Sequence, residues 1–239
     1  MDVFSAGSYR IGVLYLDNHL LVVRKPPNMP VQADRSGDLD LLTACKGYIG
    51  ERFSKPGAVY LGLVHRLDRP VGGVMVLART SKAAARLSAQ FAGHDMDKRY
   101  LCVLNGVLDG QRTLRDWLLK DEKTGSSSVV SENTSGAKLA LLDSCPIAVK
   151  HDLTLSEVQL HTGRSHQIRV QHAHIALPLW GDQRYGTGRA GEQLALWAWK
   201  LTIEHPTRHE QMTFLSRPPR DGVWGHFQEE IDGQETHHG

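Results

Sequence analysis

The chain has 239 residues, 41% of them hydrophobic, so it can bury a substantial core in one large domain or two small ones. Its formal net charge of +2 permits nucleic-acid binding but is too small to indicate it alone. No apolar run approaches the ~20 residues that a membrane span requires, and Met1–Ser5 lacks the basic and apolar regions of a secretory leader. We therefore expect a cytoplasmic protein without a membrane partner.

The cysteines Cys45, Cys102 and Cys145 have no metal-binding spacing. Three cysteines cannot all form disulfides, and this usage is typical of a reducing compartment. We expect three buried small hydrophobic side chains and no metal site.

The N-terminal part predicts a hairpin followed by a helix. Two apolar runs, 13–16 and 20–23, flank the turn-forming cluster 17–19, which predicts a β-hairpin. The proline-rich segment 25–30 must be extended. Residues 39–53 have the apolar period of an amphipathic helix.

The stretch from Val64 to Thr80 carries the densest cluster of charge beside an apolar run. Asp68 lies between two arginines, Arg66 and Arg69, just before a proline and a glycine pair that lead into a β-branched run. This pattern predicts a constrained turn at the start of a buried strand. Removing charged groups from water costs free energy, so these side chains must either form ion pairs or have a function. For an isolated Arg-x-Asp, a structural ion pair is the commoner explanation.

The middle of the chain predicts a helix, a strand and a loop. Thr80 or Ser81 can cap a helix that runs to about Gly93. Residues 98–104 alternate as a core strand, with Tyr100 among the residues on one face. The polar stretch 121–137 predicts a mobile loop.

The C-terminal part predicts two strand pairs around one helix. Residues 139–160 indicate two strands, 165–176 a helix that ends before a proline, and 194–203 with 211–215 a hairpin. Many strands, few helices and no βαβ alternation predict an α+β fold on a mixed, mostly antiparallel sheet with flanking helices and loops. We expect one domain over residues 1–225 and an acidic polar tail over 226–239.

Three ordered motifs carry a family resemblance. They are His65-Arg66-Leu67-Asp68 followed by Gly73, then Lys98-Arg99-Tyr100, then Gly163-Arg164-Ser165-His166-Gln167-Ile168-Arg169 with Gly181-Asp182 and Tyr185-Gly186 behind it. Together they resemble the RluA-type pseudouridine synthases, which isomerise uridine in ribosomal or transfer RNA. The resemblance runs from about Leu14 to about Pro218. It implies the pseudouridine synthase catalytic fold, here without an S4-like module at the N-terminus.

The implied reaction constrains the site residues. Isomerisation of uridine loses no atom, so the reaction demands no cofactor or metal. Because uracil leaves as a delocalised anion, one catalytic carboxylate can suffice. By resemblance, Asp68 is the catalytic aspartate, Tyr100 stacks on uracil and is a candidate base at C5, and Arg169 pairs with the aspartate. Whether Asp68 attacks the ribose or removes its 2′ proton stays open.

Binding of RNA requires further contacts. Base flipping costs least in single-stranded loops, so the expected partner is an RNA stem-loop, not DNA. Arg66 resembles the residue that fills the vacated space, and a carbonyl contact at the turn is an equal alternative. Arg164 is the better candidate for touching RNA, whereas His166 is equally explained as a packing residue. The expected RNA-binding residues are His65, Arg66, Arg164, His166 and Gln167, and the expected pocket-lining residues are Leu67 and Leu196.

Three departures from the family pattern bear on substrate choice. Val71-Gly72-Gly73 stands where many relatives have Thr-Ser-Gly, and Gln171 and Trp197 stand where histidines are common. None removes the three chemical residues. We expect a monomeric enzyme. The alternatives are an RNA-binding or ribosome-assembly factor without chemistry, and a nucleoside hydrolase, which would need a second acidic group.

Overall fold

The computed structural model describes residues 2–54, 56–93 and 96–234. The chain forms two compact units. Unit 1 comprises Met1–Asp97 and Ala198–Ser216, and unit 2 comprises Lys98–Trp197 and Arg217–Gly239. One domain over residues 1–225 stays a prediction.

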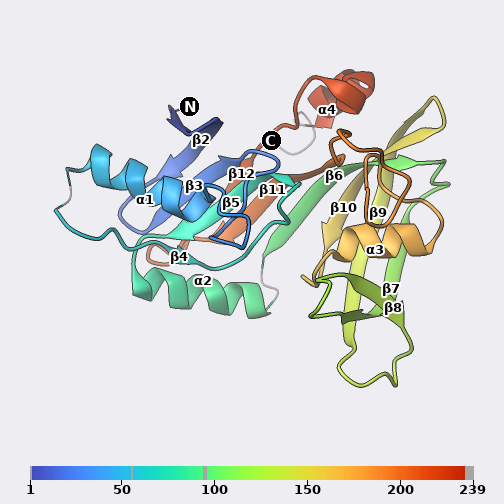
Figure 1. Ribbon diagram of the computed structural model, residues 1–239, viewed down its shortest axis with the longest axis horizontal. Coiled ribbons are helices and arrows are strands. Elements are labelled where there is room, and N and C mark those ends of the chain that lie inside the picture. Colours follow the sequence, from blue (N-terminus) through green and yellow to red (C-terminus); the bar gives the residue numbers. More distant parts are fainter. Residues whose placement is uncertain (1, 55, 94–95, 235–239) are drawn as a thin grey trace. The chain divides into compact units, whose positions relative to one another are not determined.

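Unit 1 is a mostly antiparallel sheet with two helices (Figure 1). Neighbouring strands follow the order β1, β2, β3, β5 and β11, while β4 pairs with β5 and β12 with β11. The strands are β1 (Asp2–Ala6), β2 (Tyr9–Leu16), β3 (Leu20–Lys25), β4 (Gly62–Leu63), β5 (Gly72–Ala78), β11 (Leu196–Glu204) and β12 (Gln211–Leu215), and the helices are α1 (Leu41–Arg52) and α2 (Ser81–Gly93).

The core of unit 1 lies where α2 packs on the sheet. Leu20 and Val22 of β3, Val74 and Val76 of β5, and Leu87 of α2 belong to one buried cluster. Every residue of β5 is buried, so the predicted apolar strand is confirmed.

Steric contact with the neighbouring backbone explains why β5 has a glycine at position 73. Gly73 has a φ of 120°, and a Cβ there would lie 2.3 Å from the carbonyl oxygen of Ala198. Any L side chain would therefore have to displace β11 backbone.

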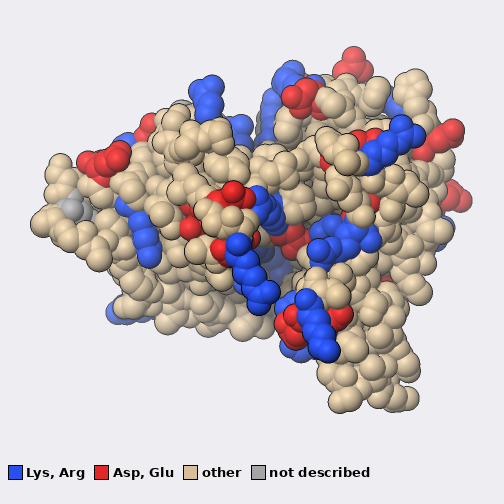
Figure 2. All heavy atoms as spheres, in the orientation of Figure 1, with Lys and Arg blue, Asp and Glu red and all other residues tan. Residues whose placement is uncertain are grey.

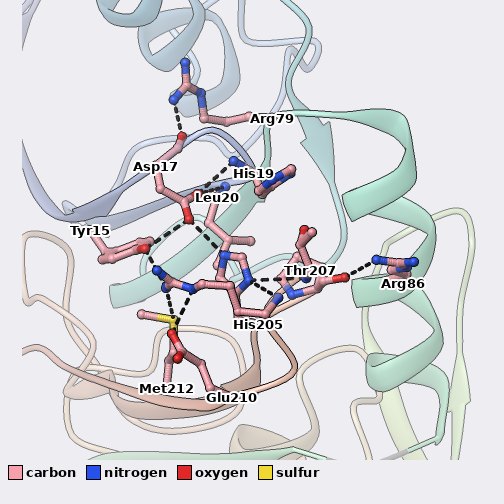
Figure 3. A network of polar contacts seen from close by, with 12 residues as sticks. Tyr15, Asp17, His19, Leu20, Arg79, Arg86, His205, Thr207, Glu210 and Met212 are labelled. Carbon is pink, nitrogen blue, oxygen red and sulfur yellow. Dashed lines mark hydrogen bonds and ion pairs between the residues drawn. The ribbon is translucent and has the colours of Figure 1, made fainter.

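A buried polar network joins the β2–β3 turn to the loop between β11 and β12 (Figure 3). The Asp17 carboxylate accepts hydrogen bonds from the N–H groups of His19 and Leu20, both at 2.7 Å, and lies 2.8 Å from Nε2 of His205. Backbone N–H groups of Thr207 and Arg208 point at Nδ1 of the same ring. Nδ1 is thus the acceptor, and Nε2 carries the proton that faces Asp17.

Asp17→Asn is expected to make the unfolding free energy less dependent on pH in acid. Burial raises the pKa of Asp17, but the N–H groups of His19 and Leu20, with His205 and Tyr15, lower it to about 2. A carboxyl whose pKa is depressed on folding stabilises the protein above the unfolded pKa of about 3.9, and this contribution is lost as the pH falls toward the folded value.

The variant should therefore lose about 1 kcal/mol of unfolding free energy at neutral pH and show a shallower fall between about pH 4 and pH 2. Urea unfolding across this range is the measurement. Glu51→Gln, at an exposed position on α1, is the control. If the unfolding free energy of Asp17→Asn fell with pH as steeply as that of the wild type, the role of Asp17 would be contradicted.

The strands of unit 2 pair antiparallel, with α3 lying across them in Figure 1. The strand order is β6, β10, β9, β7 and β8. The strands are β6 (Asp97–Asn105), β7 (Arg112–Lys120), β8 (Ser127–Val130), β9 (Lys138–Lys150) and β10 (Leu153–Leu160), and the helical segments are α3 (Gln167–His174), a 3₁₀ helix (Gly222–Phe227) and α4 (Gln228–Gln234).

The buried ring of His172 docks α3 on this sheet. Its Nδ1 lies 2.7 Å from the carbonyl oxygen of Ile168, and its Nε2 lies 2.9 Å from Oγ of Ser144 on β9. Burial lowers the pKa of His172 to about 4, so the ring is neutral at physiological pH. Ser144 pairs with Val158 on β10, and Val158 pairs with Tyr100 on β6. Tyr100 therefore belongs to the sheet face that α3 covers.

The predicted hairpins, helices and α+β class are confirmed, whereas three expectations are wrong. Residues 121–137 are not all loop, because Ser127–Val130 pairs with β7. Cys145 is exposed, unlike Cys45 and Cys102. Part of the predicted tail forms helical turns in which Phe227 and Ile231 are buried, while 235–239 lie outside the described residues. No described helix is long and apolar enough to cross a membrane.

Candidate active site

Asp68 lies on a tight turn between β4 and β5 of unit 1. Its carbonyl oxygen accepts the N–H of Val71 at 3.0 Å, which closes the turn. Its side chain is half-buried, and the neighbouring Leu67 is buried. Asp68 thus stands at the edge of the buried strand, as predicted.

A buried lysine holds this turn in place. Nζ of Lys25, at the end of β3, donates hydrogen bonds to the carbonyl oxygens of Pro26 at 3.0 Å, Arg69 at 3.0 Å and Val71 at 2.7 Å. Lys25 is fully buried, and burial lowers its pKa to about 7, while the charge of Asp68 raises it. The three acceptors favour the ammonium form, because a neutral amine has only two hydrogens to donate.

Lys25→Met is expected to destabilise unit 1 and loosen the Asp68 turn. Methionine fills most of the same volume but leaves carbonyl groups of the turn without their donor, so we expect a loss of about 2–4 kcal/mol. Urea unfolding measures the loss, with the half-exposed Lys46→Met on α1 as the control. Equal unfolding midpoints for the two variants would show that Lys25 does not support the turn.

The three other charged or aromatic residues of this motif differ in their surroundings. The His65 ring stacks on Phe91 with centroids 4.5 Å apart, and its Nε2 accepts the N–H of Val76 at 3.0 Å. These contacts give His65 a role within unit 1, and an RNA contact by it stays a prediction. Arg66 is exposed. Arg69 bonds Asp38 and the carbonyl oxygen of Asn28, which ties the turn to the segment after β3.

In unit 2, Arg169 of α3 forms a buried bidentate pair with Asp182. Its Nε and Nη2 donate to the two carboxylate oxygens at 2.7 and 2.8 Å. The guanidinium carbon also lies 5.1 Å from the ring centroid of Tyr185. Burial raises the pKa of Asp182, but Arg169 and the N–H groups of Arg184 and Tyr185 outweigh it and lower the pKa. Arg169 is therefore held in one orientation by a carboxylate and a ring.

The Gly163 turn before α3 is held by a buried glutamine. Oε1 of Gln167 accepts the Thr162 hydroxyl at 2.8 Å and the Arg164 N–H at 3.0 Å, and its Nε2 donates to Gln171 at 3.0 Å. Only 3% of the surface of Gln167 is exposed, and its side-chain oxygen bonds two residues of the turn, so Gln167 stabilises the turn from inside unit 2. Its amide is used inside unit 2, and an RNA contact by Gln167 stays a prediction. Gln171, a departure from the family pattern, continues this chain to Asp116 at 2.7 Å.

His166 and Arg164 remain at the surface of the turn. His166 adopts a left-handed conformation with a φ of 56°, and its Nδ1 lies 2.7 Å from the Tyr185 hydroxyl. That hydroxyl also accepts the N–H of Ser127 at 2.8 Å, which links the turn to β8. Arg164 is half-buried, and its Nε donates to the carbonyl oxygen of Leu139 at 2.8 Å. The predicted pocket residue Leu196 is buried.

Each unit therefore gathers part of the predicted constellation. In unit 1, Asp68 lies on the turn that Lys25 holds by hydrogen bonds. In unit 2, Tyr100 lies on the sheet face covered by α3, the helix that carries Arg169. Sequence reasoning missed Lys25 and the role of Asp182. The available signals were a lysine between an apolar strand and two prolines, and an aspartate in the quoted Gly181-Asp182 motif. The pairing of Arg169 with Asp68 stays a prediction.

Comparison with known proteins decides the family. The RNA pseudouridylate synthase family matches residues 19–174. The chain belongs to this family. The synthase is 31% identical to ribosomal large subunit pseudouridine synthase D of Pseudomonas aeruginosa, over 92% of this chain and 72% of that one. It is 28% identical to tRNA pseudouridine synthase C of Vibrio cholerae, over 94% and 97% of the two chains.

A solved structure shares the fold of the synthase. Human RNA pseudouridylate synthase domain containing 4 has a TM-score of 0.76 at 21% identity, over 92% of this chain and 93% of that one. The RluA-type assignment and the predicted fold are thus confirmed. The synthase is an isomerase that converts uridine to pseudouridine in RNA.

Proposed function

We propose that the synthase isomerises specific uridines in a stem-loop of ribosomal or transfer RNA, with Asp68 as the essential residue and without a cofactor. The observation that carries the role of Asp68 is its placement: a half-buried carboxylate on a turn that the buried Lys25 holds by three hydrogen bonds. A carboxylate on so constrained a backbone is pre-organised for one reaction geometry.

The chemistry requires one bond to break and one to form at the same ribose carbon. The bond from ribose C1′ to uracil N1 breaks, the uracil turns, and C1′ joins C5. The proton on C5 then leaves, and N1 ends with a proton, so atoms balance without an added reactant. Asp68 acts on the ribose, either at C1′ or at the 2′ proton. Tyr100 stacks on the uracil and, as its phenolate, takes up the C5 proton.

Arg169 is the residue proposed to keep the carboxylate ionised. A guanidinium near Asp68 favours its charged form and fixes its orientation. The bidentate pair with Asp182 supports this role, because a guanidinium already held along one edge presents its remaining N–H groups in a defined direction.

The proposed RNA contacts come from both units. Arg66, which is exposed, fills the space left by the flipped base, while Leu67 and Leu196 line the uracil pocket. His65, Arg164 and His166 contribute contacts to the loop. The names of the two relatives above, one acting on the large ribosomal subunit and one on tRNA, favour these two RNA classes as substrates.

The test is to incubate the purified chain with total RNA from cells that lack it and to map pseudouridine in the product. We expect new pseudouridines at a few discrete positions, with no change in nucleoside mass and no free uracil. RNA binding without any new pseudouridine would indicate a binding factor. Release of uracil would indicate a hydrolase.

A further inference from the structure

Lys98 is a buried cation without an acidic partner among the described residues. Only 9% of its surface is exposed, and no ion pair or hydrogen bond of its side chain occurs in the parts of the chain that the structure describes. Its neighbour Arg99 differs, because Arg99 pairs with Glu157 at 2.7 Å. An ammonium with little contact to water and no acid to pair with costs stability, so Lys98 calls for an explanation.

The charge that acts on Lys98 is that of another cation, Arg164. Burial lowers the pKa of Lys98, and the positive charge of Arg164 lowers it further. Within the described residues Arg164 has no ion pair either, and the one side-chain hydrogen bond found for it uses Nε, which donates to the carbonyl oxygen of Leu139. Its two terminal nitrogens are therefore available to a ligand.

We propose that Lys98 and Arg164 together bind one phosphate of the RNA backbone next to the target uridine. This proposal rests on the proposed function, because it takes the base stacked on Tyr100 as the reference point. Lys98 and Tyr100 are alternate residues of β6, so their side chains belong to the same sheet face and their Cα atoms lie ~7 Å apart. That spacing places the cation pair within a nucleotide's length of the stacked base.

A phosphate fits the pair better than other ligands do. Two adjacent cations repel each other when empty, and a single phosphate relieves that repulsion while it accepts hydrogen bonds from an ammonium and a guanidinium at once. On the visible face of each unit, lysine and arginine side chains lie among aspartates and glutamates (Figure 2). On that face, a local cation pair is therefore a better candidate for a phosphate contact than a broad basic field.

The test compares Lys98→Met, Lys98→Arg and the control Lys46→Gln. Lys46 is a half-exposed lysine of α1 in the other unit. The affinity of each full-length variant for fluorescein-labelled decauridylate is measured by anisotropy over a series of KCl concentrations. We expect Lys98→Met to weaken binding several-fold and to reduce the slope of log affinity against log salt by about 0.7, the value for one phosphate contact to a single strand. Lys98→Arg should retain most of the affinity.

Urea unfolding of the same variants separates binding from packing. Because Lys98→Met removes a desolvated charge that has no resident acid, we expect its unfolding midpoint to rise while RNA affinity falls. A midpoint below that of the wild type, with unchanged affinity and salt slope, would make Lys98 a packing residue and overturn the proposal. A loss in Lys46→Gln equal to that in Lys98→Met would also overturn it.

Failure of this proposal is distinguishable from failure of the proposed function. Binding of decauridylate requires no turnover, so a chain that shows the Lys98 effect but makes no pseudouridine would contradict the isomerase role of the site and support the phosphate site. Pseudouridine formation with a salt slope that is the same in the wild type and Lys98→Met would overturn the phosphate site alone.

Discussion

Asp68→Asn is expected to lower the rate of pseudouridine formation by more than about 10³-fold. The amide has nearly the same shape as the carboxylate, so it leaves the turn and its hydrogen bonds from Lys25 in place. It carries no charge, however, and can neither attack the ribose nor accept its 2′ proton. The measurement is the initial rate of pseudouridine formation on an RNA that the wild-type chain modifies.

RNA affinity of Asp68→Asn should stay within about 0.5 kcal/mol of the wild type. Its unfolding free energy should fall by about 1 kcal/mol, because the neutral amide no longer favours the buried ammonium of Lys25. Asp109→Asn, which changes an exposed aspartate of unit 2, is the matched control and should retain full activity. Turnover in Asp68→Asn close to that of this control would remove Asp68 from the reaction.

Asp182→Ala is expected to cost about 3 kcal/mol of unfolding free energy and to abolish most of the activity. The substitution takes the bidentate acceptor away from Arg169, a cation that is 6% exposed, and leaves the N–H groups of Arg184 and Tyr185 without this acceptor. A desolvated guanidinium without this carboxylate must move or recruit water, and either change misplaces it for the role proposed for it above. Urea unfolding and the initial rate are the two readouts.

The exposed pair of Lys120 and Glu122 is the control for this prediction. These side chains also lie 2.7 Å apart, but Glu122 is 79% exposed, so Glu122→Ala should change the unfolding free energy by less than about 0.5 kcal/mol. If Asp182→Ala were no more destabilising than Glu122→Ala, Arg169 would not depend on Asp182 for its place.

Local patterns predicted most of the secondary structure of this synthase. The hairpin at 13–23 follows from two apolar runs around Asp17, and α2 begins after Thr80, whose Oγ1 accepts the N–H of Ala83. The β7–β8 pairing was not predictable in this way. Its strand Ser127–Val130 has only four residues, and two of them are serines. The strand is defined by pairing with β7 and by the Tyr185 hydroxyl, which accepts the N–H of Ser127.

The amino-acid sequence by itself determined where the reactive side chains lie along the chain. It placed Asp68 on a turn before a buried strand and Arg169 on a helix after a glycine turn, because apolar period and glycine position are local properties. Only the tertiary structure decided which groups these side chains meet. It turned Lys25 toward the Asp68 turn, joined Arg169 to Asp182 and buried Gln167. Such pairings follow from strand register and packing between segments far apart in sequence, which no local pattern encodes.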